Sequence, residues 1–268
     1  MKIHGVDITN PDKILFPESN SSKLDVINYY KNFSGQIMPF LKGRPLTLRR
    51  FPDGVNHQGF FQKNASDYFP DFIKTVEVQT DDGKNVSVVC NNLKTLLYLA
   101  NQGTIEFHTW LSRIDKLNKP DKVVFDLDPA SGSFNSLKNA AEVIREFLDK
   151  KGIRCKLTTS GKNGLHLWYT KRRTQTFDQS REEVKHLAEE LIGLYPDLLT
   201  IEMRKDDRDG KIFIDYPRNS YGQTTICPYS LRATLNGSIA TPISWEELSS
   251  IKSSQEFNLG NISKRRRH

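Results

Sequence analysis

The segment Val123-Val124-Phe125-Asp126-Leu127-Asp128-Pro129 decides how this sequence is interpreted. Its apolar run predicts a buried strand, and the alternation of side chains along a strand places the carboxylates of Asp126 and Asp128 on one face. Two adjacent negative charges at the end of a hydrophobic strand repel each other, and bound cations would relieve that repulsion. Hard oxygen ligands of this kind suit magnesium or manganese. The segment therefore favours a metal-dependent phosphoryl-transfer site. The alternative is that the two aspartates simply end a strand before Pro129.

The composition is that of an ordinary globular protein. The chain has 268 residues, of which 37% are hydrophobic, enough for one large domain or two small ones. Its 39 Lys and Arg residues against 32 Asp and Glu residues give a formal net charge of +7. A basic surface around an acidic metal site suits a polyanionic substrate, although this charge alone is weak evidence for nucleic-acid binding.

The cysteines and the apolar segments indicate a cytoplasmic protein. Cys90, Cys155 and Cys227 are odd in number and widely spaced, which is typical of reduced thiols. The N-terminal residues contain no apolar signal segment, and no stretch approaches the length of a membrane span. We therefore expect neither secretion nor membrane insertion.

Periodicity elsewhere predicts an α+β fold. Ser22 caps a helix that is predicted to end near Gly43, and Ser244 to Glu247 form a capping box that opens a final short helix. Further helices are predicted over 92–102, 135–150 and 178–194, and strands over 45–50, 59–63, 73–78, 153–159, 165–170 and 211–216. A turn or loop is expected over 81–85. The helices should pack on sheets that share one cleft.

A third carboxylate, Asp215, ends the apolar run of Ile212-Phe213-Ile214-Asp215-Tyr216-Pro217. If a neighbouring strand carries it, three carboxylates could hold two divalent ions. One ion would lower the pKa of an attacking 3′-hydroxyl, and the second would grip a triphosphate and offset charge on the leaving pyrophosphate.

The segment Ser160-Gly161-Lys162-Asn163-Gly164-Leu165-His166 combines small residues, a cation and an imidazole. Such a turn can bind phosphate through its backbone N–H groups. The sequence Asn163-Gly164 between two strands is also a good hairpin signal that needs no ligand. His166 could donate to a triphosphate oxygen, though a lone histidine is more often structural.

The motifs DLDP (126–129), SGKNGLH (160–166) and FIDYPRN (213–219), in this order, resemble the three motifs of the archaeo-eukaryotic primase superfamily. Other segments resemble the polymerase domain of bacterial DNA ligase D: residues 10–17, 44–54, 60–63, 106–113 and 228–233. The resemblance implies a primase-like fold with mixed and antiparallel sheets flanked by helices around a central cleft. It also implies a single catalytic domain over 1–268, with an N-terminal part (1–110), a catalytic core (111–250) and a basic tail (264–268).

The resemblance implies roles for individual residues. The metal ligands would be Asp126, Asp128 and Asp215, holding two ions, with manganese used better than magnesium, and His108 would be a further candidate catalytic residue. The incoming nucleotide would be held by Ser160, Gly161, Lys162, His166, Arg218 and Arg232, with Ser160 near the sugar. The role of Lys162 is the least defined, because the family often has its lysine where Asn163 stands here.

The resemblance also implies DNA contacts. A downstream 5′-phosphate would be bound by Asn10, Lys13 and Lys23, through charge-assisted hydrogen bonds. The template and its backbone would be contacted by Arg49, Arg50, Phe60, Phe61 and Lys63, with the two aromatic rings as stacking faces. Taken alone, the lysines would be solvated surface residues and the phenylalanines core residues of a strand. The loop 205–210 could move Arg208 toward the metal site, and the loop 81–85 corresponds to a segment that helps two DNA ends meet in relatives.

The implied function is a nucleotidyltransferase of non-homologous end joining. It would fill gaps and extend 3′ ends at double-strand breaks, prefer ribonucleotides over deoxyribonucleotides, and recognise a downstream 5′-phosphate. Ku protein and a DNA ligase would be its partners, two copies could pair across DNA, and the protein would be cytoplasmic and nucleoid-associated. The chain resembles the stand-alone form of the family. The alternatives are a primase or translesion primase-polymerase, a module that binds and aligns DNA ends, and, less well supported, a metal-dependent nuclease.

Overall fold

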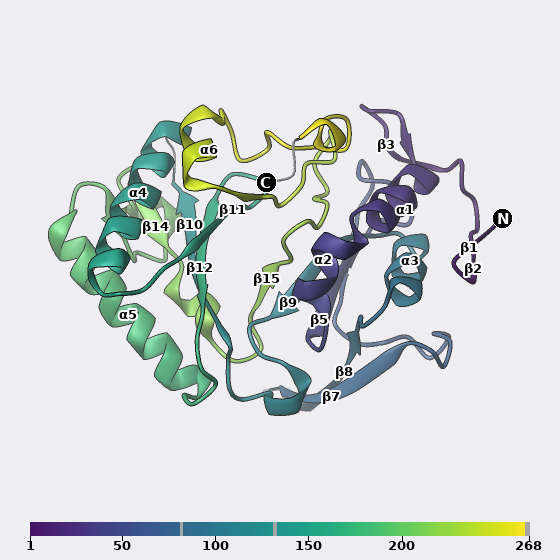
Figure 1. Ribbon diagram of the computed structural model, residues 1–268, viewed down its shortest axis with the longest axis horizontal. Coiled ribbons are helices and arrows are strands. Elements are labelled where there is room, and N and C mark those ends of the chain that lie inside the picture. The colour runs from purple at the N-terminus through teal and green to yellow at the C-terminus, as the bar shows by residue number, and fades with distance from the viewer. Residues whose placement is uncertain (81–82, 131–132, 266–268) are drawn as a thin grey trace. The chain divides into compact units, whose positions relative to one another are not determined.

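The computed structural model describes residues 1–80, 83–130 and 133–265. The chain divides into two compact units that alternate along the sequence. Unit 1 comprises Met1–Asp115, Thr224–Ala240 and Phe257–His268, and unit 2 comprises Lys116–Gln223 and Thr241–Glu256. Each unit is built around its own six-stranded sheet, and Figure 1 labels the elements.

The helices and strands have the following bounds. The α-helices are α1 (Lys23–Asn32), α2 (Ser34–Leu41), α3 (Leu93–Asn101), α4 (Phe134–Lys150), α5 (Phe177–Leu194) and α6 (Trp245–Ser250). The strands of unit 1 are β1 (Lys2–Ile3), β2 (Val6–Asp7), β3 (Ile14–Phe16), β4 (Ser21–Ser22), β5 (Pro45–Arg50), β6 (Phe60–Gln62), β7 (Lys74–Thr80), β8 (Gly83–Val89), β9 (Thr104–Trp110) and β15 (Thr224–Ile226). Those of unit 2 are β10 (Lys122–Pro129), β11 (Lys156–Thr159), β12 (Leu165–Thr170), β13 (Leu199–Thr200), β14 (Ile212–Ile214) and β16 (Pro242–Ile243).

The sheet of unit 2 has the order β13-β14-β10-β12-β11-β16 and is antiparallel except for the pair β13 and β14. Strand β10 lies inside this sheet, with β12 and β14 as its neighbours. Along β10, Phe125 and Leu127 share one face with their partners Leu167 and Leu165, while Asp126 lies opposite His166 on the other face. The alternation thus separates an apolar face from a polar one.

Helices α4 and α5 cover the apolar face of this sheet. Figure 1 shows both helices on the same side of β10 and β12. Ser133 caps α4 and Thr176 caps α5, the latter with a complete capping box, and each helix buries one apolar stripe. The predictions of helices over 135–150 and 178–194 are therefore confirmed. Burial of the apolar face leaves the opposite face of β10 to carry the polar residues.

Asn219 ties the backbone of β10 to the segment that follows β14. Its side-chain oxygen accepts a hydrogen bond from the N–H of Val124 at 2.9 Å, and its side-chain nitrogen donates to the carbonyl of Val124 at 2.8 Å. Asn219 is buried. On the other side from β12, the pairing with β14 covers only Leu127 to Pro129, so at Val124 the amide takes the place of a neighbouring strand and satisfies two buried backbone groups.

Unit 1 has the sheet order β15-β9-β5-β8-β7, and β6 pairs with β5. Helices α1 and α2 pack with α3 over a hydrophobic core, and α3 also contacts β9. Within this core the hydroxyl of Tyr30 donates to the carbonyl of Ile105 at 2.6 Å and accepts from the N–H of Leu231 at 3.0 Å. Tyr30 thus links α1 to β9 and to the chain segment that precedes Arg232.

The predicted helix from Ser22 to Gly43 is wrong as a single element. The structure has α1 and α2, separated at Phe33, whose φ of −100° and ψ of 12° are not helical. Gly35 and Pro39 are poor helix formers, and Pro39 also removes a backbone donor inside α2. The apolar residues of the two helices still face one core, which is why the periodicity continues across the break.

Three further expectations differ from the structure in detail. The predicted strand over 153–159 begins only at Lys156, and the predicted strand over 211–216 ends at Ile214. That strand ends because Asp215 caps a 3-10 turn over Tyr216–Asn219 that contains Pro217. In the expected loop over 81–85, residues 83–85 belong to β8, while 81 and 82 lie outside the described residues. Of the basic tail, residues 266–268 also lie outside them.

The α+β class with antiparallel sheets and flanking helices is confirmed. Strand β9 was not predicted, although Thr104 to His108 alternate polar and apolar residues, and most of its side chains are buried. Within residues 1–80, 83–130 and 133–265, no helix combines the length and the apolar character that crossing a bilayer requires.

Candidate active site

The candidate site in unit 2 is built on the polar face of β10. Asp126 and Asp128 lie on this strand, and Asp215 directly follows the neighbouring strand β14. The N–H of Asp215 donates to the carbonyl of Asp126 at 2.9 Å, which aligns the two backbones at this point. As a result, one carboxylate oxygen from each of the three residues lies within 4.8 Å of the others. The structure therefore brings together the three predicted metal ligands.

Two cationic or polar side chains surround the cluster. Nε2 of His166, on β12, lies 3.1 Å from Oδ1 of Asp126. Arg218 bridges two carboxylates: its Nε lies 3.2 Å from Oδ2 of Asp126, and its Nη2 lies 2.7 Å from Oδ2 of Asp215. The two residues predicted to hold a nucleotide thus lie against the predicted metal ligands.

The aspartates differ in their electrostatic environment. Burial alone would raise the pKa of Asp126, but His166 and Arg218 outweigh it and hold the pKa at about 2. Burial, and next the negative charge of Asp126, raise the pKa of Asp128 to about 6. Burial likewise raises the pKa of Asp215, against the opposing effect of Arg218. His166 and Arg218 therefore stabilise the negative charge of Asp126, whereas the negative charge of Asp128 is not stabilised to the same degree.

This donor set fits divalent cations. Three carboxylates supply the hard oxygen ligands that Mg²⁺ and Mn²⁺ prefer. Burial and the charge of Asp126 both disfavour the ionised form of Asp128, and a bound cation would favour it. The residues that would hold the ions are Asp126, Asp128 and Asp215.

The loop between β11 and β12 is organised by Ser160. Its hydroxyl accepts hydrogen bonds from the N–H of Gly164 at 2.9 Å and from the N–H of Lys162 at 3.3 Å. The hydroxyl of Ser254 donates to the carbonyl of Gly164 at 2.6 Å. Gly161 has a φ of +70°, a conformation that favours glycine. The loop is therefore more than a two-residue hairpin, because a buried serine network fixes it.

Gly164 fits this loop against the metal-ligand strand. A Cβ at this position would lie 2.4 Å from the carbonyl oxygen of Leu127 and 3.1 Å from Oδ1 of Asp128. No side chain fits at the first of these distances. The predicted phosphate-binding turn is therefore in close contact with the strand that carries Asp126 and Asp128.

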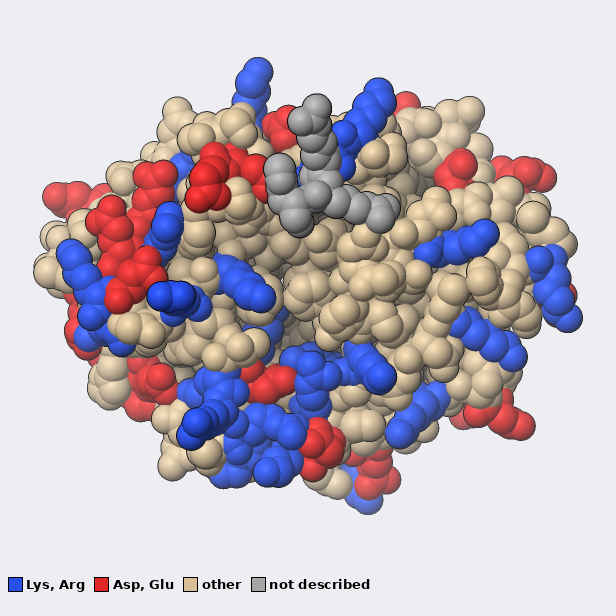
Figure 2. All heavy atoms as spheres, viewed as in Figure 1, with Lys and Arg blue, Asp and Glu red and all other residues tan. Residues whose placement is uncertain are grey.

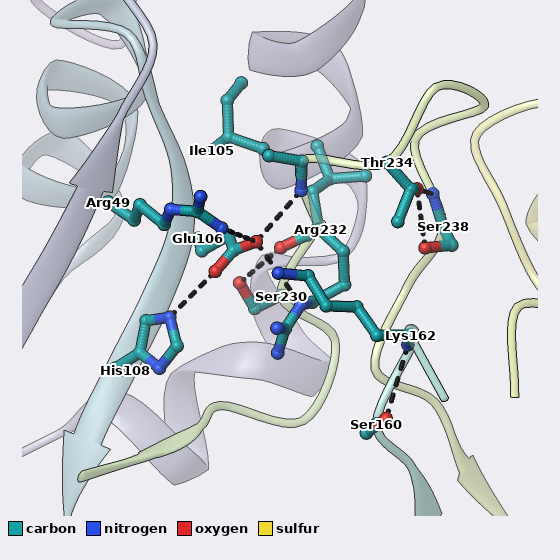
Figure 3. Close-up of polar contacts among 12 residues, drawn as sticks. Arg49, Ile105, Glu106, His108, Ser160, Lys162, Ser230, Arg232, Thr234 and Ser238 are labelled. Carbon is teal, nitrogen blue, oxygen red and sulfur yellow. Dashed lines mark hydrogen bonds and ion pairs between the residues drawn. The ribbon is translucent and has the colours of Figure 1, made fainter. Parts of the chain in front are cut away.

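The other predicted site residues belong to unit 1. His108 and Arg49 lie on β9 and β5, and Arg232 lies after β15. All three side chains contact the buried carboxylate of Glu106 (Figure 3). Glu106 did not emerge from the sequence as a site residue. Its signal was the spacing Glu106-Phe107-His108, which places two polar side chains on one face of a strand.

The aromatic residues predicted to stack on template bases are exposed. Phe60 is 46% exposed and Phe61 58% exposed, so the alternative that they are core residues is wrong. Arg49 lies over the ring of Phe61 and Arg50 over that of Phe60. Arg50 is itself buried, and its guanidinium donates to the carbonyl of Gln102 and to the side chains of Gln62 and Tyr68. Lys63, at the end of this segment, is exposed.

The predicted 5′-phosphate residues also lie together in unit 1. The N–H of Lys23 donates to the carbonyl of Lys13 at 2.8 Å, and the N–H of Lys13 donates to that of Asn10 at 3.2 Å. Burial, and next the charge of Lys13, lower the pKa of Lys23. The Lys13 ammonium contacts Oδ1 of Asp53 at 2.6 Å. The Lys23 ammonium donates to the carbonyl of Thr9 at 2.9 Å, so each lysine has an acceptor within unit 1.

Arg208 is held by its own loop. Its Nε donates to the carbonyl of Glu202 and its Nη2 to that of Met203, each at 2.9 Å. The guanidinium also stacks on the ring of Phe213, which lies opposite Asp128 in the pairing of β14 with β10. Arg208 is thus anchored one strand from the carboxylates.

The net charge of +7 is unevenly distributed. Figure 2 shows acidic and basic side chains interspersed at its left margin, where Figure 1 places α4 and α5. Helix α5 carries five acidic and two basic residues, whereas α4 carries three of each. The acidic excess on this side of unit 2 is therefore that of α5.

Comparison with known proteins identifies the family. A model of the LigD primase-polymerase domain matches residues 22–268. The chain belongs to the LigD primase-polymerase domain family. It is 34% identical over 259 residues to the bifunctional non-homologous end joining protein LigD of Bacillus subtilis, covering 96% of this chain and 42% of that protein. It is 31% identical over 262 residues to the multifunctional LigD of Pseudomonas aeruginosa, covering 97% of this chain and 31% of that protein.

A solved structure agrees with this membership. The polymerase domain of Mycobacterium tuberculosis ligase D, in complex with DNA, matches with a TM-score of 0.92 and 29% identity. The match covers 97% of this chain and 93% of that one. The chain spans less than half the length of the two LigD proteins above. The LigD primase-polymerase family is one of nucleotidyltransferases, and the carboxylate cluster has the donor set that this chemistry requires.

Substitution of Asp128 by Asn should stabilise the folded protein when divalent cations are removed by a chelator. In the folded protein the pKa of Asp128 is about 6, above its usual 3.8. Ionisation of Asp128 therefore lowers the free energy of unfolding, with its full effect above about pH 6. The loss of stability shrinks as the pH falls from 6 toward 3.8. At about pH 7.5 with chelator, Asp128→Asn should raise the free energy of unfolding by about 1–3 kcal/mol. Urea denaturation measures this. Added Mn²⁺ should stabilise the natural protein more than the variant. A variant less stable than the natural protein at that pH would contradict the assignment.

Substitution of Gly164 by Ala should displace the turn from β10. Because the new Cβ would meet the carbonyl of Leu127 at 2.4 Å, the backbone must shift next to Asp128. Mn²⁺ affinity, measured by calorimetry, should fall by roughly tenfold or more, corresponding to about 1.4 kcal/mol. Gly193→Ala is the matched control, since open space surrounds Gly193 inside α5. The control should leave Mn²⁺ affinity unchanged and add about 0.5–1 kcal/mol of stability. Equal Mn²⁺ affinities in all three proteins would refute the prediction.

Proposed function

We propose that this protein is a template-directed polymerase that adds nucleotides to the 3′ end of a nucleic-acid primer, using two divalent cations. The observation that carries the proposal is the geometry of unit 2. Three carboxylates lie together, with His166 and Arg218 against them and the Ser160 to Gly164 turn packed on the same strand. Carboxylates for cations beside cationic groups for phosphates are what nucleotidyl transfer from a triphosphate needs.

The residues of the chain would divide the work as follows. Asp126, Asp128 and Asp215 would hold the cations, which when bound activate the 3′-hydroxyl and neutralise charge on the triphosphate. Arg218 has a planar guanidinium that suits phosphate oxygens as well as carboxylates, and it lies beside the site where cations would take over the neutralisation of Asp126. We infer that Arg218 and His166 contact the triphosphate, together with the backbone of the Ser160 turn.

We further propose a preference for ribonucleotides and recognition of a downstream 5′-phosphate. Ser160 is the residue we assign to the sugar. Lys13 and Lys23, with Asn10, are assigned to the phosphate, since a terminal phosphate carries more charge than an internal phosphodiester. Asp53 accepts from Lys13 in the structure, and a bound phosphate would replace this carboxylate. Manganese is the cation that we expect to support activity best.

We propose that the biological setting is non-homologous end joining. The names of the LigD relatives describe such proteins, and the neighbouring solved structure is a complex with DNA. Ku protein, a DNA ligase, and a second copy of the chain bound through DNA are the partners that this setting implies. A cytoplasmic, nucleoid-associated location is part of the same proposal.

A second candidate is a module that aligns DNA ends without synthesis. It is favoured by the Lys13 and Lys23 pair, which belongs to unit 1, whereas the carboxylates belong to unit 2. A primase that starts chains on single-stranded DNA is a variant of the first proposal and would not need the lysine pair.

Primer extension on a gapped duplex with Mn²⁺ tests the proposed chemistry. The natural protein should extend the primer faster with NTPs than with dNTPs. Asp126→Ala should reduce the rate by at least about 10³-fold, because it removes a cation ligand, while leaving DNA binding largely intact. Phosphate-dependent DNA binding without any extension would instead support the alignment module, and synthesis by Asp126→Ala at the natural rate would remove the metal assignment.

Substitution of Lys13 or Lys23 by Ala tests phosphate recognition. Each should lower the preference for a 5′-phosphorylated over a 5′-hydroxyl gap by roughly tenfold or more, because a hydrogen bond to a charged group contributes about 1.5–3 kcal/mol. Fluorescence anisotropy with both gapped duplexes measures the preference. Lys31→Ala, at an exposed position in the last turn of α1, is the control and should keep it. A preference unchanged in both lysine variants would exclude this pocket, and extension indifferent to the phosphate would favour the primase.

A further inference from the structure

Glu106 is a buried carboxylate at the centre of a cationic cluster in unit 1. It is 0% exposed. Its Oε1 lies 3.3 Å from Nη1 of Arg49 and 3.4 Å from Nε of Arg232, and its Oε2 lies 2.9 Å from Nε2 of His108. Oε1 also accepts from the N–H of Ala233 at 3.0 Å. These contacts converge from three parts of the chain, as Figure 3 shows.

The named contacts of Glu106 join one carboxylate to two guanidinium groups and an imidazole. A single carboxylate faces two guanidinium groups, which stay protonated at any physiological pH, and an imidazole. A carboxylate buried this deeply is costly unless it is paired and hydrogen-bonded, and here both oxygens are. One carboxylate cannot accept from all the N–H donors of two guanidinium groups. The planar donor arrays of the two arginines suit the oxygens of an anionic ligand as well as those of Glu106.

Glu106 also fixes the directions of its partners. By accepting from Nε2 of His108, it selects one ring orientation and one tautomer for the neutral imidazole. Arg49, held at one terminal nitrogen, lies 4.9 Å from the ring centroid of Phe51 and 5.3 Å from that of Phe61. The ring of Phe61 in turn meets that of His108 edge-on, with centroids 5.8 Å apart.

The exposed ring of Phe61 thus packs against side chains that Glu106 binds. It is 58% exposed, and it contacts Arg49 and His108. Both of these residues are bound by Glu106. A stacking ring that is fixed before a base arrives loses less conformational entropy on binding. A change at Glu106 should therefore be felt at Phe61, although the two side chains need not touch.

We propose that Glu106 is a positioning residue that orients Arg49, Arg232, His108 and Phe61. Together these side chains contact two polyanionic ligands, the template strand and the triphosphate of the incoming nucleotide. This inference rests on the proposed polymerase function. If Glu106 positions both sets of contacts, removal of its charge should weaken binding of the template and of the nucleotide together.

Glu106→Gln tests the proposal. Glutamine keeps the size and an acceptor for the N–H of Ala233, but it removes the charge that attracts both arginines. The KM values for primer-template and for nucleotide should both rise by roughly tenfold or more, with a smaller change in kcat. Affinity of the Asp126, Asp128 and Asp215 cluster for Mn²⁺, measured by calorimetry, should stay unchanged.

Tyr30→Phe is the matched control for a merely structural effect. It removes the hydroxyl that bonds to the backbone of Ile105 and Leu231, next to Glu106 and Arg232, without changing any charge. It should lower stability and leave both KM values near those of the natural protein. In an Arg49→Ala background, Glu106→Gln should raise the KM for primer-template by a smaller factor than it does alone, because one of the positioned groups is already absent.

The outcomes separate the inference from the proposed function. Natural KM values in Glu106→Gln, or KM changes that match those of Tyr30→Phe, would overturn the positioning role while leaving the polymerase proposal standing. If Glu106→Gln does not fold, Glu106→Asp, which keeps the charge but shortens the side chain, should raise both KM values in its place. If the natural protein extends no primer, the polymerase proposal fails. The anisotropy of labelled single-stranded DNA then still tests whether Glu106→Gln weakens polyanion binding.

Discussion

The pairing of β10 with its two antiparallel neighbours is the constraint on which the catalytic chemistry depends. Register alone places His166 opposite Asp126, and the hydrogen bond from the N–H of Asp215 to the carbonyl of Asp126 aligns the third carboxylate. A shift of one residue would turn the carboxylates toward the apolar face under α4 and α5. Asn219 and Gly164 support this register from either side, one by bonding to Val124 and the other by leaving room for Leu127.

Unit 2 and unit 1 solve opposite electrostatic problems. In unit 2, three carboxylates lie beside one arginine and one histidine, so negative charge is in excess and Asp128 has a raised pKa. In unit 1, the carboxylate of Glu106 lies among two arginines and a histidine, so cationic side chains gather around one buried anion. The carboxylates of unit 2 favour bound cations, and the arginines of unit 1 favour phosphate groups.

Glu106 illustrates how a site residue can escape sequence reasoning. Alone in a strand it looks like one more acidic residue, and nothing local signals that it is buried. Its importance comes from partners that are distant in sequence: Arg49 is 57 residues away, and Ala233, beside Arg232, is 127 residues away. By contrast, the carboxylates of unit 2 stand at the ends of apolar strands, a pattern that is visible locally.

The sequence by itself determined the elements whose signals are local: the strand with Asp126 and Asp128, the capped helices α4 and α5, and the residues of the three motifs. Hydrophobic periodicity and capping act over a few residues, which makes them legible in the chain. Tertiary structure alone decided the exposure of Phe60 and Phe61 and the bridging of Asp126 and Asp215 by Arg218. These features depend on burial and on charge pairs between distant segments, and such energies exist only once the strands have been brought together.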